Sequence, residues 1–190
     1  MIIAAVVSWL FARDGTREVV ATRARVAGGP EQIWDRIMFY EDVPGRPAFP
    51  LRALLPAPVR TDGDKSRVGA TVRCAYTDGE LAKRITVAEA PHLLQFDVIE
   101  QRLGIEGCLL TRGGSYQIHG GGDASDVVLT TNYQAYLRPR PFWRPLERLL
   151  VGQLHSHILR GIGEAALRRH PHRGQAAAES RTRACAVPEV

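Results

Sequence analysis

Residues 141–170 read PFWRPLERLLVGQLHSHILRGIGEAALRRH, and this stretch determines how the rest of the chain is interpreted. Apolar side chains recur in it every three or four residues, which is the spacing of one face of an α-helix. The stripe consists of Phe142, Leu146, Leu149, Leu150, Leu154, Ile158, Ile162 and Ala165. Pro171 ends the pattern, so we predict one long amphipathic helix from about Pro141 to His170.

The residues from Arg67 to Leu137 alternate between apolar and polar side chains, as antiparallel strands do. Asp78-Gly79 is a typical hairpin turn, and Ala90-Pro91-His92 marks another turn. Five or six antiparallel strands are therefore expected before the terminal helix.

The elements that precede these strands are shorter. Residues 17–26 alternate as a half-buried strand, and Pro30-Glu31 is a typical helix start. We expect Trp34, on this first helix, to be a buried core residue. The proline-rich stretch from Glu41 to Pro58 leaves room for a short second helix near Phe49–Leu55.

This order of elements is typical of the α+β class. We predict a curved antiparallel β-sheet that grips one long C-terminal α-helix, with two short helices after the first strand and an internal cavity. Gly152, Gly161 and Gly163 each cost the terminal helix roughly 1 kcal/mol of stability. They make sense if they relieve crowding against the sheet or leave space for the cavity.

Four segments carry a resemblance to a known family. The segment Gly29-Pro30-Glu31-Gln32-Ile33-Trp34-Asp35-Arg36-Ile37 resembles the first helix of the START-like helix-grip (SRPBCC) superfamily, which includes the polyketide cyclase/dehydrase family. Also similar are the hairpin from Tyr76 to Ile85, the strand at Gly113-Gly114-Ser115-Tyr116 and the approach from Tyr136 to Trp143 into the long helix. The resemblance covers residues 17–167 and implies a fold with a ligand cavity. The superfamily shares no catalytic motif, so the resemblance assigns no catalytic residue and no cofactor.

Composition agrees with one soluble domain and a tail. The chain has 190 residues, of which 45% are hydrophobic and 24% charged, and this excludes collagen-like, low-complexity and multi-span membrane proteins. We divide it into an apolar N-terminal segment (1–15), a helix-grip ligand-binding domain (16–170) and a disordered tail (171–190).

The cysteines and the N-terminal run bear on localisation. Cys74, Cys108 and Cys185 have no metal-ligand spacing, and their odd number favours reduced thiols in a cytoplasmic protein. We expect Cys74 and Cys108 to be small apolar strand residues and predict no metal site. The run Met1–Ala12 is too short to span a bilayer. The alternatives are an element packed on the domain and a membrane anchor, or the end of a longer membrane helix.

The candidate cavity residues follow from the faces of the predicted strands. Tyr76, Phe96, Tyr116 and Tyr133 have inward parity, and Leu154 belongs to the helix stripe. His155 follows Leu154 and lies one turn beyond Val151. It either borders the cavity or is a half-exposed histidine.

Lys83 is the most distinctive candidate site residue, because it is a charged side chain on the same apolar strand face as Leu81 and Ile85. On the next strand, Glu100 has the parity of Phe96. A turn at Ala90-Pro91 puts Lys83 opposite Val98, with Glu100 placed diagonally. A buried Lys–Glu pair would orient a ligand; alternatively, strand twist lets both side chains reach water.

The terminal region carries the basic excess, with 10 Lys and Arg against 4 Asp and Glu in residues 138–190. Arg140, Arg144 and Arg148 stack at helical spacing. They form either a solvated face or a surface that attracts an anionic membrane. No aromatic residues are interleaved with them, so a nucleic-acid partner is not predicted.

Three functions fit this pattern. The favoured one is non-catalytic binding or transport of a small hydrophobic or amphipathic molecule, such as a lipid, isoprenoid or polyketide, because the sequence offers only one candidate polar pair. One alternative is an enzyme of the cyclase/dehydrase kind, with an acid or base such as Glu100, Lys83 or His155. The other is a peripheral membrane or lipid-transfer module that uses the N-terminal run and the arginine-rich terminal helix.

Overall fold

The computed structural model of the chain describes residues 15–39 and 58–168. In these ranges its elements follow in the order β1 (Thr16–Ala27), α2 (Pro30–Phe39), β2 (Pro58–Asp62), β3 (Thr71–Tyr76), β4 (Gly79–Glu89), β5 (Leu93–Arg102), β6 (Leu109–Gly120), β7 (Ala124–Ala135) and α4 (Arg140–Arg168). The predicted N-terminal run, the short helix near Phe49–Leu55 and the tail 171–190 lie outside the described residues.

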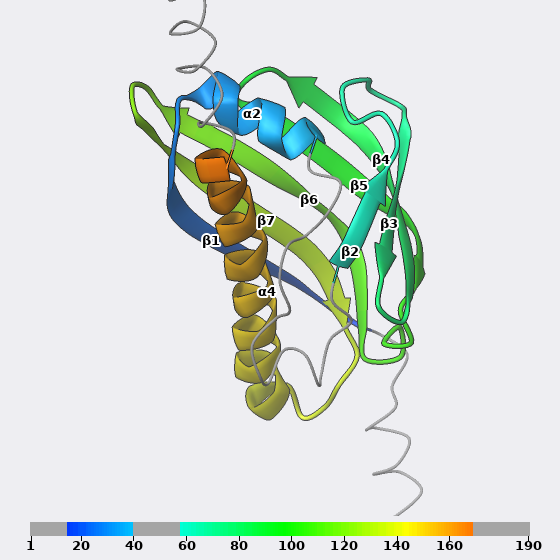
Figure 1. Cartoon of the computed structure of the whole chain (residues 1–190). Coiled ribbons are helices and arrows are strands. Elements are labelled where there is room, and N and C mark those ends of the chain that lie inside the picture. The colour runs from blue at the N-terminus through cyan, green and yellow to red at the C-terminus, as the bar shows by residue number, and fades with distance from the viewer. Residues whose placement is uncertain (1–14, 40–57, 169–190) are drawn as a thin grey trace, which may run out of the picture.

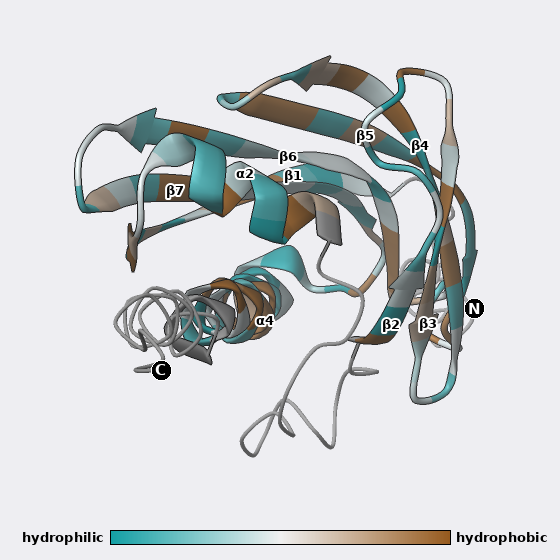
Figure 2. Ribbon diagram, turned by 45° about the horizontal axis from the view of Figure 1, so that its top comes forward, coloured by the Kyte–Doolittle hydropathy of each residue, from teal (hydrophilic) through white to brown (hydrophobic). Residues whose placement is uncertain are grey.

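The strands form one antiparallel sheet in the order β1-β7-β6-β5-β4-β3-β2. The sheet is strongly curved, and α4 lies against its concave side, nearest to β1 and β7 (Figure 1). Figure 2 shows α4 almost end-on, with α2 close to its C-terminal end and β2 to β5 curling away on the other side. The predicted sheet with a long helix across its concave face is therefore confirmed.

The buried face of α4 differs from the predicted stripe. The buried side chains of its described residues include Glu147, Val151, His155, Leu159 and Ile162, whereas Phe142 and Leu149 are 64% and 55% exposed. Two polar residues thus belong to the buried face, and a stripe drawn through apolar residues alone is rotated away from it. No helix within the described ranges is both long enough and apolar enough to cross a membrane.

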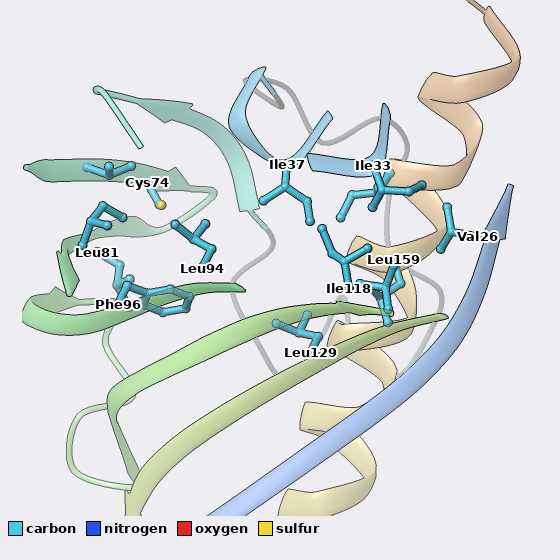
Figure 3. Close-up of a cluster of buried hydrophobic side chains, with 14 of the residues drawn as sticks. Val26, Ile33, Ile37, Cys74, Leu81, Leu94, Phe96, Ile118, Leu129 and Leu159 are labelled. Atoms are coloured by element: carbon cyan, nitrogen blue, oxygen red, sulfur yellow. The ribbon is translucent and has the colours of Figure 1, made fainter. Parts of the chain in front are cut away.

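The main core fills the space between the sheet and the two helices. Figure 3 shows Ile33 and Ile37 of α2 facing Ile118 of β6 and Leu159 of α4, with Leu94 and Phe96 of β5 further along the curve. Trp34 packs against this cluster but is only partly buried, so its predicted burial was wrong. Ile33 and Ile37 take the anchoring role because they lie on the inner face of α2.

The two described cysteines differ in their surroundings. Cys74 is a buried strand residue, as predicted. Cys108 is exposed and lies in the turn before β6, so the prediction of an apolar strand residue was wrong there.

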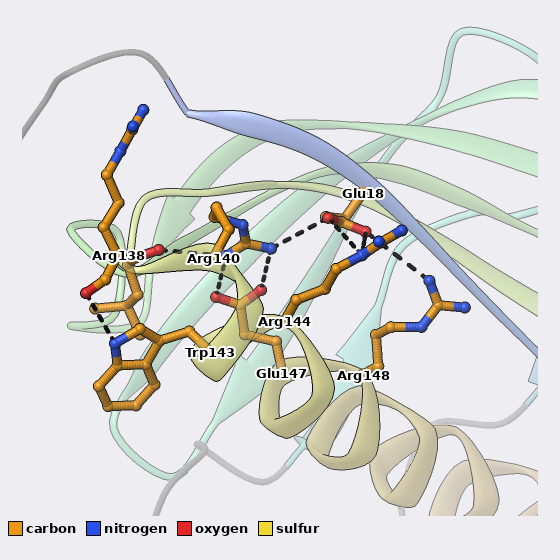
Figure 4. Close-up of polar contacts among 8 residues, drawn as sticks. Glu18, Arg138, Arg140, Trp143, Arg144, Glu147 and Arg148 are labelled. Atoms are coloured by element: carbon orange, nitrogen blue, oxygen red, sulfur yellow. Dashed lines mark hydrogen bonds and ion pairs between the residues drawn. The ribbon is translucent and has the colours of Figure 1, made fainter.

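Ion pairs fix the N-terminal end of α4 to β1. The guanidinium of Arg140 donates to both carboxylate oxygens of Glu147, each at 2.8 Å, and to Glu18 at 3.2 Å. Arg144 and Arg148 also reach the Glu18 carboxylate, at 3.0 and 3.9 Å (Figure 4). The arginines that could have formed an anion-attracting face are therefore turned toward a carboxylate that is only 7% exposed.

Candidate functional site

Two adjoining hollows lie between the concave face of the sheet and the helices. The larger one, of about 90 Å³, reaches α4, and the smaller one, of about 60 Å³, reaches α2 and β2. They share three lining residues, Lys83, Phe96 and Tyr116. We treat them as two lobes of one cavity, because the same side chains form the boundary between them.

Six of the eight residues predicted from the sequence line the larger hollow. They are Tyr76, Lys83, Phe96, Tyr116, Leu154 and His155. The sheet supplies the first four and α4 the last two, so the structure brings together residues that are up to about 80 positions apart. Their role in ligand binding stays a prediction.

The proposed pairing of Lys83 with Glu100 is wrong. Lys83 does lie opposite Val98, as predicted, but the next pair along the strands is Ala82 with Glu100. One residue of β4 thus corresponds to two of β5, which is a β-bulge at Ile99. The bulge turns Glu100 to the outer face of the sheet, where its carboxylate pairs with Arg102.

Tyr133 also lies outside both hollows. It is fully buried, but in a second cluster with Val20, Ala135 and Val151 under the N-terminal half of α4. The prediction that Tyr133 faces inward was therefore correct. The residue does not line a hollow, because α4 covers this end of the concave face. Burial, with a smaller contribution from Glu147 and Glu18, raises the pKa of Tyr133 to about 12.

The ammonium of Lys83 lies in a largely apolar setting. Its Nζ is 4.4 Å from the centroid of the Phe96 ring, an arrangement that favours a cation over the ring face. The Cys74 thiol and the hydroxyls of Tyr76 and Tyr116 are the neighbouring polar groups. No carboxylate in the described ranges forms an ion pair with Lys83.

Opposing effects act on the charge of Lys83. Burial is the largest, and it lowers the pKa, whereas Cys74, Tyr76 and Tyr116 in their ionised forms raise it and leave the pKa above its ordinary value of 10.5. Burial also raises the pKa of Tyr76, to about 12, and that of Tyr116. At neutral pH the cavity therefore holds a charged ammonium and two neutral phenols.

His155 lies at the α4 side of the larger hollow, and it is buried, not half-exposed. Its Nε2 is 2.8 Å from the Thr131 hydroxyl and its Nδ1 is 3.0 Å from the Thr22 hydroxyl. Burial lowers the pKa of His155 to about 4, so the imidazole is neutral at pH 7. A neutral ring has one donor and one acceptor nitrogen, and the two hydroxyls can complement both. The histidine therefore joins α4 to β1 and β7.

Several lining residues were not singled out from the sequence. Thr131 could have been found, because it is a polar residue on the inward face of its strand. Leu103 and Ile105 line the larger hollow from the segment between β5 and β6, which has no periodic pattern to reveal them. Gly113 lets β6 approach β5 closely, because a Cβ there would meet the Phe96 carbonyl. Gly114 lets β6 approach β7, because a Cβ there would meet the Thr130 carbonyl as well as the Phe96 ring. The described residues contain no cluster of three or more His, Cys, Asp or Glu side chains suited to a metal ion.

The comparisons with known proteins bear on the fold. No family model matches the sequence, and no curated protein matches it. Among solved structures, the Zhui aromatase/cyclase from Streptomyces sp. R1128 superposes with a TM-score of 0.58 at 15% identity, over 84% of this chain and 99% of the other. Norcoclaurine synthase from Thalictrum flavum, in complex with dopamine and hydroxybenzaldehyde, gives 0.54 at 16% identity, over 82% and 90%.

A third structure, from Thermus thermophilus, gives a TM-score of 0.56 at 15% identity, over 80% of this chain and 99% of that one. At these identities the similarity concerns the fold alone. The chain has the helix-grip fold that its sequence resemblance implied.

Proposed function

We propose that the protein binds or transports a small hydrophobic or amphipathic molecule in the cavity between the sheet and α4. The observation that carries this proposal is the pair of hollows that share Lys83, Phe96 and Tyr116. Apolar side chains from β4, β5, β6, β7 and α4 supply most of the lining, which is the usual composition of a ligand site.

The size of the cavity narrows the class of molecule. The two hollows of about 90 and 60 Å³ together compare with a cavity of roughly 150 Å³ that holds one benzene molecule in an engineered protein core. A single aromatic ring or a short branched chain fits this space. A long acyl chain or a multi-ring polyketide would require the lining residues to move apart.

Binding of toluene tests the proposal, because toluene has a single aromatic ring, is uncharged and is observable by ligand-detected NMR. Leu154→Trp places a large side chain in the larger hollow and should abolish saturation transfer to toluene. Leu149→Trp is the matched control, since Leu149 lies on the same helix but is 55% exposed. Transfer that is unaffected by Leu154→Trp, or lost equally in both variants, would argue against the cavity as the site.

An enzyme of the cyclase/dehydrase kind is the second candidate. The convergence of the Lys83 ammonium with the hydroxyls of Tyr76 and Tyr116 favours it, because such donors can stabilise an enolate oxygen during a condensation. The structural neighbours include an aromatase/cyclase and norcoclaurine synthase. A binding protein returns its ligand unchanged, so mass spectrometry of the ligand after incubation separates the two candidates.

A cytoplasmic location and a peripheral membrane contact through Met1–Ala12 remain part of the proposal. Sedimentation with anionic vesicles would test the membrane contact, and cell fractionation would test the location.

A further inference from the structure

Within the part of the chain that the structure describes, the cavity has a positive charge at Lys83 and no carboxylate in its lining. Lys83 forms part of the boundary between the two hollows, and no Asp or Glu is among their described lining residues. Lys65 also lines the smaller hollow, where its ammonium donates to the Ile37 carbonyl at 3.1 Å. Both lysines of a chain that otherwise uses arginine for its positive charge thus lie at one cavity.

Arg140, another largely buried cation, has carboxylate partners. Arg140 is 18% exposed and has two carboxylates, Glu18 and Glu147, within 3.2 Å. Burying a charge without a partner is costly, and proteins normally supply such a partner. For Lys83, the carboxylate of Glu100 on the neighbouring strand is instead turned outward by the bulge at Ile99 and pairs with Arg102.

The remaining polar groups around Lys83 can donate hydrogen bonds to an acceptor. The hydroxyls of Tyr76 and Tyr116 lie near the ammonium, and both are neutral at pH 7. Charge-assisted hydrogen bonds from such groups to a carboxylate are among the strongest that proteins form. The Phe96 ring next to the ammonium offers an apolar surface to the body of a ligand.

We infer that the ligand of this cavity is a small organic anion, a carboxylate or an equivalent oxyanion on a compact apolar body, whose charged end binds Lys83 between Tyr76 and Tyr116. This inference rests on the proposed binding function and names the class of its ligand. The apolar body of the ligand extends into the larger hollow toward Leu154 and Ile158.

Phenylacetate and phenylacetamide test the inference, because they have the same shape and differ in charge. At pH 7 the wild-type protein should bind phenylacetate about tenfold more tightly than phenylacetamide, a difference of about 1.4 kcal/mol. Lys83→Met should remove this preference and leave the affinity for phenylacetamide nearly unchanged. Arg84→Met is the matched control: it removes a positive charge from the exposed face of the same strand and should preserve the preference.

Equal affinities of the wild-type protein for the acid and the amide would overturn the inference, as would a preference that survives Lys83→Met. In both cases toluene binding that depends on Leu154 would leave the proposed function in place. Absence of toluene binding to the wild-type protein would instead reject the proposed function itself, so the two failures are distinguishable.

Discussion

The imidazole Nε2 of His155 lies 2.8 Å from the hydroxyl oxygen of Thr131, which joins the middle of α4 to the strand beneath it. The two residues are 24 positions apart, and Thr22 of β1 holds the other ring nitrogen. Burial favours a neutral ring here, because an imidazolium would lose its hydration and the two neutral hydroxyls offer no opposite charge.

Acid should therefore destabilise the protein through His155. The pKa is about 4 in the folded state and 6.5 ordinarily, so the unfolded chain takes up a proton that the folded chain does not. The stabilisation is complete above pH 6.5 and is lost between pH 6.5 and 4, by about 2–3 kcal/mol. Urea unfolding at pH 7.5 and 4.5 should show this loss in the wild-type protein. His155→Gln should lose less stability between these two pH values than the wild-type protein does. His119 is exposed, so His119→Gln is the control and should lose as much as the wild-type protein. A His155→Gln variant with unaltered pH dependence would disprove the assignment.

The carboxylate of Glu18 should be needed to hold the start of α4. Glu18→Gln leaves Arg140 with one carboxylate fewer, and breaking a buried ion pair costs roughly 3–5 kcal/mol. We expect Glu18→Gln to lower the free energy of unfolding, measured with urea, by about 2–4 kcal/mol. The cost is below the full range because the partly exposed Arg144 and Arg148 can turn to water. Asp126→Asn is the control: its partner Arg23 is largely exposed, so the cost should be at most about 1 kcal/mol. Equal costs would show that the Glu18 cluster is no stronger than a surface pair.

Two glycines should respond in opposite ways to alanine. In Gly114→Ala the new Cβ would overlap the Thr130 carbonyl, a backbone atom that cannot turn aside, so unfolding should become easier by about 1–3 kcal/mol. In Gly152→Ala nothing lies within 4 Å of the new Cβ, and the helix should gain about 0.5–1 kcal/mol. Gly152 therefore does not relieve crowding against the sheet, and the other explanation, that it leaves space for the cavity, stays a prediction. Thermal unfolding of both variants would check the opposite signs, and a stabilised Gly114→Ala would refute the close approach of the strands.

Removing the Lys83 charge should stabilise the ligand-free protein. At pH 7 the phenols of Tyr76 and Tyr116 are neutral and do not offset the burial of the Lys83 ammonium, so this burial opposes folding. Methionine fills a similar volume without that cost. Lys83→Met should raise the free energy of unfolding by about 1–2 kcal/mol, whereas Arg84→Met on the outer face should change it little. A clear destabilisation by Lys83→Met would mean that an anionic group of the chain itself already satisfies the ammonium.

Much of this architecture could be predicted because its signals are periodic. Strand alternation placed Lys83, Phe96 and Tyr116 on one face, and the register of Lys83 with Val98 was correct. The bulge at Ile99 could not be predicted from the alternation of apolar and polar residues. Glu100 keeps the parity of Phe96 in the sequence but faces the other side of the sheet.

The polar residues of the buried helix face account for the other errors. Glu147 and His155 belong to that face only because Arg140, Thr22 and Thr131 satisfy them. These partners lie on other elements or a different helical turn, so no local pattern predicts the pairing. Apolar spacing therefore located α4 but not its rotation, and Phe142 and Leu149 were wrongly placed toward the sheet.

Lysine-selective NMR tests the central claim most directly, because the chain contains two lysines, Lys65 and Lys83. Protein with isotope-labelled lysine side chains should show two signals, and Lys83→Met identifies which belongs to Lys83. Titration with phenylacetate at pH 7 should shift the Lys83 signal in a saturable way, while phenylacetamide should shift it less and require a higher concentration. A Lys83 signal that stays in place while phenylacetate binds would contradict an interior site with Lys83 at its charged end.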